Sequence, residues 1–280
     1  DLAGHSEGGH TLRIAGYKPA PVQVSGIGYM STTGLHAMDY FLTDGYCDPL
    51  GTAEQLFSER LLRLPQSHFC YHPPERLLRA ADYPEVPHRG LVFGSFNNFS
   101  KITDSMLLIW LKILQMVPGA KLLLKNSHPN RRAQEKNMHR RLEQLGYRPG
   151  QYEVRSSSVG YLREYQEMDI ALDTYPYVGG GTTCEALYMG VPVITLYGTR
   201  HGTRFGYSLL RNLELGELAA ADPEDYIRKA AALAQDRILL ETLKKQLRGR
   251  IQVSPLMDQQ AYMESVQAAY EEIWQHWCNL

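Results

Sequence analysis

A glycine-rich turn followed by two threonines is the part of the chain best suited to bind phosphate. Gly179, Gly180 and Gly181 directly precede Thr182 and Thr183. Glycines let the backbone turn tightly and let a ligand approach without Cβ atoms in the way. Residues 170–172 read as a strand, and a helix starting near Thr182 would point free N–H groups and its positive dipole end at an anion. This order of strand, turn and helix indicates nucleotide binding in an α/β sheet.

The same residues also fit a structural interpretation. Thr182 at the N-cap and Glu185 three residues later form a capping box, in which the Glu185 carboxylate turns back to the Thr182 amide. Glycine-rich turns between strands and helices also occur without a ligand. The residues alone therefore leave nucleotide binding and simple helix capping open.

Two further polar groups follow expected strands. Lys101 comes after the strand at 91–96 and is placed to meet a phosphate, with Asn98 as a hydrogen-bonding neighbour. The alternative is a solvated lysine before the helix at 104–117. Arg200 and His201 lie in segment 199–204 after the strand at 193–196, where they would bind diphosphate or acceptor, or form a solvated loop. Asp39 starts a strand at 39–44, where most aspartates are turn or cap residues.

Other chemistries have weaker support. Asp44 and Asp48 lie in a loop, and Asp169 and Asp173 bracket an apolar strand, so neither pair is close enough in sequence to indicate Mg²⁺ on a diphosphate. The four cysteines are far apart and indicate neither a zinc site nor a disulfide framework. We therefore expect no metal site and no cofactor. No Ser-His-Asp or Cys-His nucleophile pattern stands out.

The amino-acid composition limits the kinds of binding partner and the cellular compartment that we expect. The chain has 280 residues, 44% of them hydrophobic and 21% charged, which is typical of a globular protein with a sizeable core. A net charge of −1 without long basic runs argues against nucleic acid and anionic membrane surfaces as partners. No apolar stretch reaches the roughly 18 residues that span a bilayer. A reducing cytoplasm is the default location.

The elements that must position these residues form two parts. Residues 1–75 carry a short helix at 11–16 and strands at 22–29, 39–44 and 61–65, and the proline-rich segment 76–89 reads as a linker. From 90 to 256, strands alternate with helices, which predicts a parallel sheet covered on both faces. Residues 257–280 form a last helix with an amphipathic stripe. The chain opens without Met on what reads as the end of a strand, so we expect a fragment.

Several motifs in this order resemble the catalytic region of the O-linked N-acetylglucosamine transferases and plant SPINDLY proteins. The resemblance covers nearly the whole chain, and its final motif is closest to the SPINDLY branch. The matching runs are PAPVQV at 19–24, GY at 28–29, TTGL at 32–35, DY at 39–40, TD at 43–44, FGSFNN at 93–98, KI at 101–102, LDTYPY at 172–177 and TTCEALYMGVP at 182–192.

The resemblance implies a two-lobed α/β enzyme of GT-B type, with a complete Rossmann-like C-terminal lobe and a truncated N-terminal lobe. It also implies that the last helix packs back on the first lobe. Such enzymes move a sugar from a nucleotide donor to Ser or Thr hydroxyls of proteins, with inversion and without a metal. The partners implied are a nucleotide sugar, a protein acceptor, the upstream part of the first lobe and helical (tetratricopeptide) repeats.

Residue roles follow from the same resemblance. Asn98 matches a nucleotide-contacting position and Lys101 a diphosphate lysine. Thr182 and Thr183 match threonines on the diphosphate, and Glu185 matches a residue that binds ribose. Asp39 matches an aspartate near the reaction centre, so together with Lys101 it is an expected catalytic residue.

Two positions depart from the pattern of the N-acetylglucosamine enzymes. Tyr161 stands where a histidine lies over the base, and Gly181 stands where a histidine precedes the two threonines. The base and the sugar therefore remain open. We expect UDP-N-acetylglucosamine as the donor, with GDP-fucose, or a non-catalytic module that binds nucleotide sugar, as the alternatives.

Overall fold

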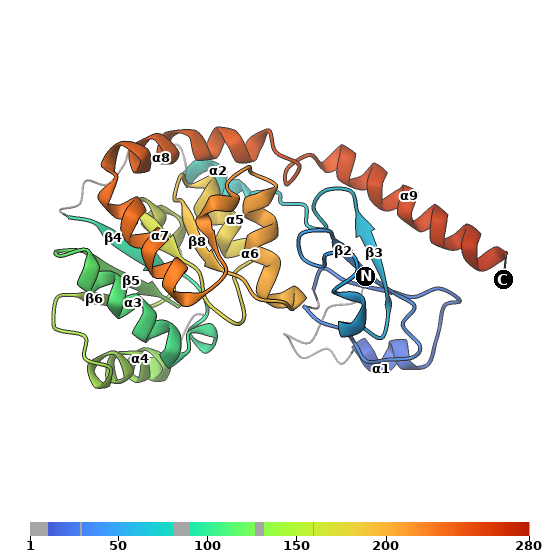
Figure 1. The fold of residues 1–280 in the computed structure, drawn as a ribbon, viewed down its shortest axis with the longest axis horizontal. Helices are drawn as coiled ribbons and strands as arrows, with labels where there is room; N and C mark the ends of the chain where they lie inside the picture. Colours follow the sequence, from blue (N-terminus) through green and yellow to red (C-terminus); the bar gives the residue numbers. More distant parts are fainter. Residues whose placement is uncertain (1–10, 29, 81–89, 127–131, 159, 280) are drawn as a thin grey trace.

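The structure is a computed structural model that describes residues 11–28, 30–80, 90–126, 132–158 and 160–279. It has two lobes side by side, the first built from the N-terminal residues and the second from the middle of the chain (Figure 1). A long C-terminal helix, α9, leaves the second lobe and runs along the first. The α/β class and the parallel sheets expected from the sequence are confirmed.

The second lobe is a six-stranded sheet in the order β6-β5-β4-β7-β8-β9, and every pairing within it is parallel. Its strands are β4 (Val92–Ser95), β5 (Lys121–Lys125), β6 (Tyr152–Arg155), β7 (Ile170–Leu172), β8 (Val193–Leu196) and β9 (Ala219–Ala220). The chain builds outward from β4 in one direction and from β7 in the other. Right-handed crossovers therefore place the helices that follow β4 and β7 on opposite faces.

The described part of the second lobe has six helices, and the two expected to start at residue 104 and near Thr182 begin within one residue of those positions. The six helices are α3 (Asp104–Met116), α4 (Arg132–Gln144), α5 (Gly181–Tyr188), α6 (His201–Arg211), α7 (Pro223–Gln235) and α8 (Arg237–Gln252), with short 3₁₀ turns η2 (Phe99–Lys101), η3 (Tyr161–Glu167) and η4 (Gly216–Leu218). Thr103, Asp222 and Asp236 cap α3, α7 and α8 through side-chain oxygens. Segment 199–204 was expected to bind diphosphate or acceptor or to form a solvated loop, and its residues 201–204 form the first turn of α6.

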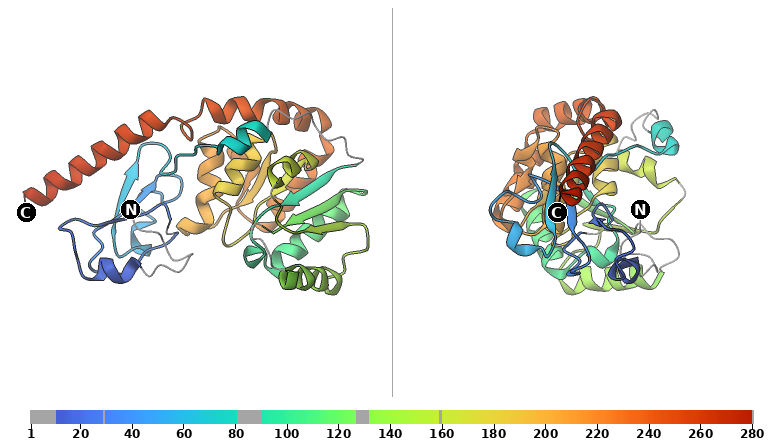
Figure 2. Two further views of the ribbon diagram at one scale, coloured as in Figure 1. Left: turned by 180° about the vertical axis from the view of Figure 1, so that it is seen from behind. Right: turned by 90° about the vertical axis from the view of Figure 1, so that its right-hand side faces the viewer.

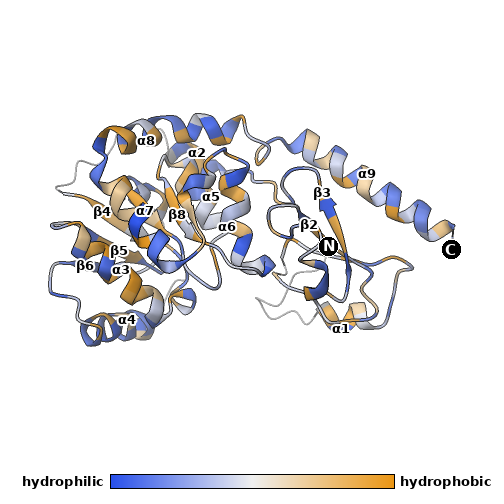
Figure 3. Ribbon diagram, in the orientation of Figure 1, coloured by the Kyte–Doolittle hydropathy of each residue, from blue (hydrophilic) through white to orange (hydrophobic). Residues whose placement is uncertain are grey.

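One hydrophobic core holds this lobe together. The strands are its most hydrophobic elements, whereas α4 is mostly hydrophilic (Figure 3). Trp110 of α3 is fully buried and donates its indole N–H to the hydroxyl of Tyr226 on α7 at 3.2 Å. That hydroxyl in turn donates to the backbone oxygen of Asp173 at 3.0 Å. The core helices are therefore tied to the end of β7, where the expected site begins.

The first lobe is small. It contains α1 (Thr11–Gly16), the turn η1 (Glu54–Leu56) and a parallel sheet in the order β1-β2-β3, with strands β1 (Val24–Ser25), β2 (Tyr40–Asp44) and β3 (Arg60–Leu64). The strand expected at 22–29 is thus only two residues long. Helix α2 (Glu75–Ala80) takes up residues 76–80 of the expected linker, and 81–89 lie outside the described residues.

Helix α9 (Gln259–Cys278) lies along the outer side of the first lobe, as the views from behind and from the side show (Figure 2). Ile273 is buried with Leu42, Leu62 and Leu64, and Tyr262 and Val266 pack against the same cluster. Tyr270 and Trp277, from the same stripe, stay 46% and 43% exposed. Only part of the apolar stripe therefore contacts the first lobe in the described structure.

Candidate functional site

The expected site lies where the strand order of the second sheet reverses. β4 and β7 are neighbours, but the chain leaves them toward opposite edges, so the segments after their carboxyl ends flank a crevice. Asn97 follows β4, and its side-chain oxygen accepts a hydrogen bond from the Thr182 hydroxyl at 3.2 Å. The cavity beneath is about 20 Å³, too small for a nucleotide. A nucleotide would therefore lie over the turn that follows β7 rather than beneath it.

Lys101 extends from η2 to this turn. Its Nζ donates to the backbone oxygen of Val178 at 3.2 Å and lies 4.1 Å from the centre of the Tyr177 ring. Burial lowers the pKa of Lys101, and the carboxylate of Asp173 opposes that shift. A half-buried ammonium group held by one carbonyl and one aromatic face can still donate to an anion.

The turn itself is shaped around the buried carboxylate of Asp173. This side chain accepts hydrogen bonds from the Gly179 amide at 2.7 Å, the Thr174 amide at 2.9 Å and the Thr195 hydroxyl at 2.8 Å. Burial raises the pKa of Asp173 to about 6, although these hydrogen bonds lower it. A Cβ atom on Gly179 would lie 2.5 Å from the Thr183 hydroxyl, so the turn requires glycine there.

Helix α5 begins at this turn without a side-chain cap. Its N-cap is Gly180, and within the described residues this cap makes no side-chain hydrogen bond. In contrast, α3, α7, α8 and α9 all have a Thr or Asp cap. The first amides of α5 are therefore left for water or an anion. Gly181 is exposed and Thr183 is buried.

The capping-box interpretation of Glu185 is wrong. The helix begins before Thr182, and the Glu185 carboxylate turns to two phenols instead of back to the Thr182 amide. Its Oε1 accepts from the Tyr161 hydroxyl at 2.9 Å and its Oε2 from the Tyr165 hydroxyl at 3.1 Å. Burial raises the pKa of Glu185, and these two hydrogen bonds oppose the shift. The structure thus brings Tyr161 and Glu185 together at the α5 end of the crevice.

Three expected site residues make other contacts, and a fourth is exposed. The Asn98 side chain caps η2 by accepting from the Ser100 amide at 3.0 Å. Arg200 is exposed at the N-cap of α6. His201 is 2% exposed, and its Nδ1 lies 2.7 Å from Asp48. Asp39, just before the amino end of β2, pairs with Lys18 and accepts from the Gln23 amide at 2.7 Å.

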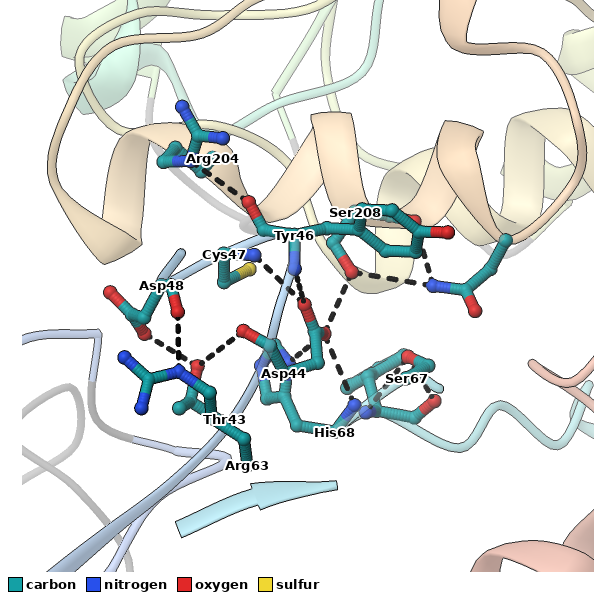
Figure 4. A network of polar contacts seen from close by, with 12 residues as sticks. Thr43, Asp44, Tyr46, Cys47, Asp48, Arg63, Ser67, His68, Arg204 and Ser208 are labelled. Atoms are coloured by element: carbon teal, nitrogen blue, oxygen red, sulfur yellow. Dashed lines mark hydrogen bonds and ion pairs between the residues drawn. The ribbon is translucent and has the colours of Figure 1, made fainter. Parts of the chain in front are cut away.

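A buried polar network between the lobes has no counterpart in the sequence predictions. Asp44, at the carboxyl end of β2, accepts from His68 Nδ1 at 2.6 Å and from the Ser208 hydroxyl of α6 at 2.7 Å (Figure 4). Arg204 of α6 donates to the backbone oxygen of Tyr46 at 2.9 Å. Although burial opposes ionisation, the hydrogen bonds from His68, the Cys47 amide and Ser208 hold the pKa of Asp44 well below its usual range.

The comparisons with known proteins agree on one family. The sequence model described as "Glycosyl transferase family 41" matches residues 1–79 and 71–266. A Petunia hybrida protein named probable UDP-N-acetylglucosamine–peptide N-acetylglucosaminyltransferase SPINDLY is 37% identical over 282 residues, which are 100% of this chain and 30% of that protein. An Arabidopsis thaliana protein, SEC, whose name gives the same probable activity, is 30% identical over 293 residues. The match covers 100% of this chain and 29% of that protein.

Solved structures agree with this assignment. A mutant O-GlcNAc transferase of Thermobaculum terrenum aligns with a TM-score of 0.86 and 35% identity, covering 96% of this chain and 51% of that one. S. aureus TarM, with a TM-score of 0.58 and 11% identity over 83% of this chain and 44% of its own, shares the fold alone. The chain spans about 30% of the length of the curated relatives it matches. In the described ranges no helix is long and apolar enough to cross a membrane.

Proposed function

The chain belongs to glycosyltransferase family 41, and on that premise we propose that it is the catalytic region of a protein O-glycosyltransferase. The reaction moves N-acetylglucosamine from UDP-N-acetylglucosamine to Ser or Thr hydroxyls of proteins, with inversion and without a metal or cofactor at the transfer site. The named activities of the relatives and their UDP-sugar donor support this substrate pair.

One observation carries the proposal: a lysine amine and an uncapped helix N-terminus meet at the reversal point of the sheet. Lys101 is held over the turn by the Val178 oxygen, and α5 presents its first amides to the same crevice. In the transfer, the leaving nucleoside diphosphate gains negative charge. Fixed donors aimed at that charge lower the barrier without reorganising during the reaction. Lys101 and the amides of Thr182 and Thr183 supply these donors.

The nucleoside end of the donor lies toward η3 in this proposal. Glu185 accepts hydrogen bonds from the ribose hydroxyls with lone pairs that its two phenol partners leave unused. The Tyr161 ring, fixed by its own hydrogen bond to Glu185, stacks on the base. A carboxylate beside a diphosphate is electrostatically unfavourable, so recognition of the ribose diol explains its position better than a structural role.

The remaining expected residues receive no direct part in the chemistry. The hydrogen bonds of Asp39 to Lys18 and Gln23 favour a structural role, and the burial of His201 keeps it away from the donor. The acceptor hydroxyl oxygen attacks the anomeric carbon from the side opposite the diphosphate, which inverts the configuration. The bond between that carbon and the diphosphate oxygen breaks, and the hydroxyl proton leaves to solvent. Lys101 and the first amides of α5 stabilise the negative charge that develops on the leaving diphosphate.

A transfer assay with the full-length protein tests the proposal. Purified protein is incubated with an acceptor peptide and either UDP-N-acetylglucosamine or GDP-fucose, and the peptide mass is followed. We expect a gain of one N-acetylhexosamine with the UDP-sugar, which Lys101→Ala abolishes. A gain of one deoxyhexose only would reassign the donor. No transfer from either donor, with nucleotide still bound, would make the chain a nucleotide-sugar-binding module.

A further inference from the structure

Three metal-ligating side chains meet in the buried space between the lobes. Cys47 and His68 come from the first lobe, and His201 comes from the first turn of α6 in the second. One ligand atom from each lies within 4.8 Å of the other two. Cys47 and His68 have no exposed surface and His201 has 2%. Cys47 and His68 lie beneath α6 in Figure 4.

Each histidine is oriented by a carboxylate. His68 Nδ1 lies 2.6 Å from Asp44, and His201 Nδ1 lies 2.7 Å from Asp48. A carboxylate that accepts from Nδ1–H fixes the tautomer in which Nε2 carries a free lone pair, as it does behind metal-bound histidines. The ring centres lie 5.0 Å apart and are tilted by 58°. Two imidazoles on one tetrahedral zinc have centres roughly 5 Å apart, from a Zn–N bond of about 2.0 Å.

Two buried polar atoms at this place have no hydrogen-bond partner. They are His68 Nε2 and Asp48 Oδ1. Buried polar side-chain atoms are normally satisfied, and each exception needs an explanation. A cation bound to His68 Nε2 would give this nitrogen a partner. A water in the fourth coordination position of that cation, or the cation itself, would give Asp48 Oδ1 a partner.

The charge of the cluster also favours a cation. Asp44 and Asp48 are fully buried, and in the described part of the chain neither carboxylate accepts a hydrogen bond from a Lys or Arg side chain. Buried charges are ordinarily paired or bound to metal. A divalent cation here would offset both carboxylates at once.

We propose that Cys47, His68 and His201 bind one zinc ion that joins the two lobes. A thiolate with two imidazoles suits Zn²⁺ better than Mg²⁺ or Ca²⁺, which prefer oxygen ligands. Binding replaces the Cys47 S–H bond by a Zn–S bond, and the proton leaves to solvent. Ligand atoms around tetrahedral zinc are roughly 3.3–3.6 Å apart, so the three must close by up to about 1.5 Å.

This site is separate from the donor crevice, but one residue connects them. The Val178 side chain packs with Cys47 and Phe205, while its backbone oxygen accepts from Lys101. The zinc therefore has a structural task, which is to hold the first lobe against α6 behind the donor turn. No metal site is expected from the sequence, because spacing patterns compare only residues that are close in the sequence. Cys47, His68 and His201 come together only in the fold.

Metal analysis of the untagged protein, expressed with zinc in the medium, tests this inference without any measurement of transfer. We expect one zinc ion per chain by elemental analysis after gel filtration. Cobalt replacement should give the absorption of tetrahedral cobalt with one thiolate ligand, a signature that needs no variant. Zinc added to the metal-free protein should raise its melting temperature.

Matched variants separate the site from adventitious binding. Cys47→Ala should lose the zinc and the thiolate-to-cobalt band, whereas Cys70→Ala, at a half-buried cysteine of the same lobe, should keep both. Asp48→Asn removes only the carboxylate behind His201 and should weaken zinc binding by about 10- to 100-fold. Wild-type protein without bound zinc and without the cobalt signature would overturn the inference. Equal zinc in the wild type and Cys47→Ala would overturn it as well.

Discussion

Replacing Glu185 by glutamine distinguishes a ribose ligand from a structural carboxylate. Glutamine keeps one oxygen acceptor, and its amide can donate to the other phenol oxygen, because a tyrosine hydroxyl both donates and accepts. The contacts to Tyr161 and Tyr165, at 2.9 and 3.1 Å, can therefore both persist. Burial raises the pKa of Glu185, so loss of its charge also removes a desolvation penalty. We expect an unchanged or slightly higher melting temperature without ligand.

The Glu185→Gln variant should bind nucleotide more weakly although its folded structure is at least as stable as that of the wild type. Hydrogen bonds to charged groups contribute about 1.5–3 kcal/mol, and those to neutral groups about 1 kcal/mol. Changing one carboxylate that accepts from a ribose diol into an amide should therefore cost about 1.4 kcal/mol, a tenfold rise in Kd for UDP. Pyrophosphate has no ribose, and removal of a neighbouring negative charge should leave its affinity equal or stronger.

Calorimetric titration with UDP and with pyrophosphate measures both effects. Tyr161→Phe is the matched control, because it removes one hydroxyl that donates to Glu185 while it keeps the carboxylate and the ring. We expect this control to bind pyrophosphate as the wild type does and to keep most of its UDP affinity. A lower melting temperature with unchanged UDP affinity in Glu185→Gln would refute the ribose assignment. Equal losses for UDP and pyrophosphate would refute it too.

Three further predictions concern other parts of the chain. Lys101→Ala should weaken UDP binding by about 1.5–3 kcal/mol and leave uridine binding unchanged in the same titration. Lys112→Ala, at an exposed lysine, is the control. Equal losses of affinity for both ligands would exclude a diphosphate contact. Because the folded-state pKa of Asp173 is raised from 3.8 to about 6, the folded protein binds more protons between these values, and the free energy of unfolding falls as pH rises through 6. The expected loss is about 3 kcal/mol, and urea titrations of Asp173→Asn should show a flatter profile; an identical profile would contradict the assignment. Ile273→Ala should lower that free energy by about 2–4 kcal/mol if α9 is packed as described, and a loss below about 0.5 kcal/mol would show that it is not.

The regular part of the fold could be read from the sequence because the strands at the centre of its sheet are buried and almost entirely apolar. The strand predicted at 193–196 is β8 with the same bounds, and all four of its residues are buried. Strands buried on both faces read as continuous hydrophobic runs, and their alternation with helices fixes a parallel sheet. The reversal point between β4 and β7 then follows from chain order, and with it the positions of Lys101 and the α5 turn.

Helix α6 was not predicted, and two of its glycines have a packing role that the sequence does not show. A Cβ atom at Gly206 would lie 2.5 Å from the Thr195 hydroxyl and 2.8 Å from Asp173 Oδ2. At Gly202 it would lie 2.9 Å from the Met30 backbone oxygen. These glycines therefore allow close packing of a helix rather than a turn. Local patterns do not reveal such a role, because the atoms involved are remote in sequence.

The errors at the candidate site have the same origin. The capping box at 182–185 is locally consistent, but tertiary contacts from Tyr161 and Tyr165 on η3 draw the Glu185 carboxylate away from its own helix. Cys47, His68 and His201 are far apart in the chain, and spacing rules for metal sites cover only ligands on neighbouring segments. Side chains that meet only across the lobe interface could not be grouped from the sequence.

Residue-resolved NMR of the amide groups during titration with UDP shows whether the start of α5 binds the leaving diphosphate. We expect the amide signals of Gly181, Thr182 and Thr183, at the start of α5, to shift on addition of UDP, and the signal of the Lys101 side chain to shift with them. Uridine should leave the α5 amides in place, because their partner is the diphosphate. Shifts confined to another part of the chain, or identical shifts with uridine and UDP, would contradict the claim that this helix N-terminus holds the leaving group.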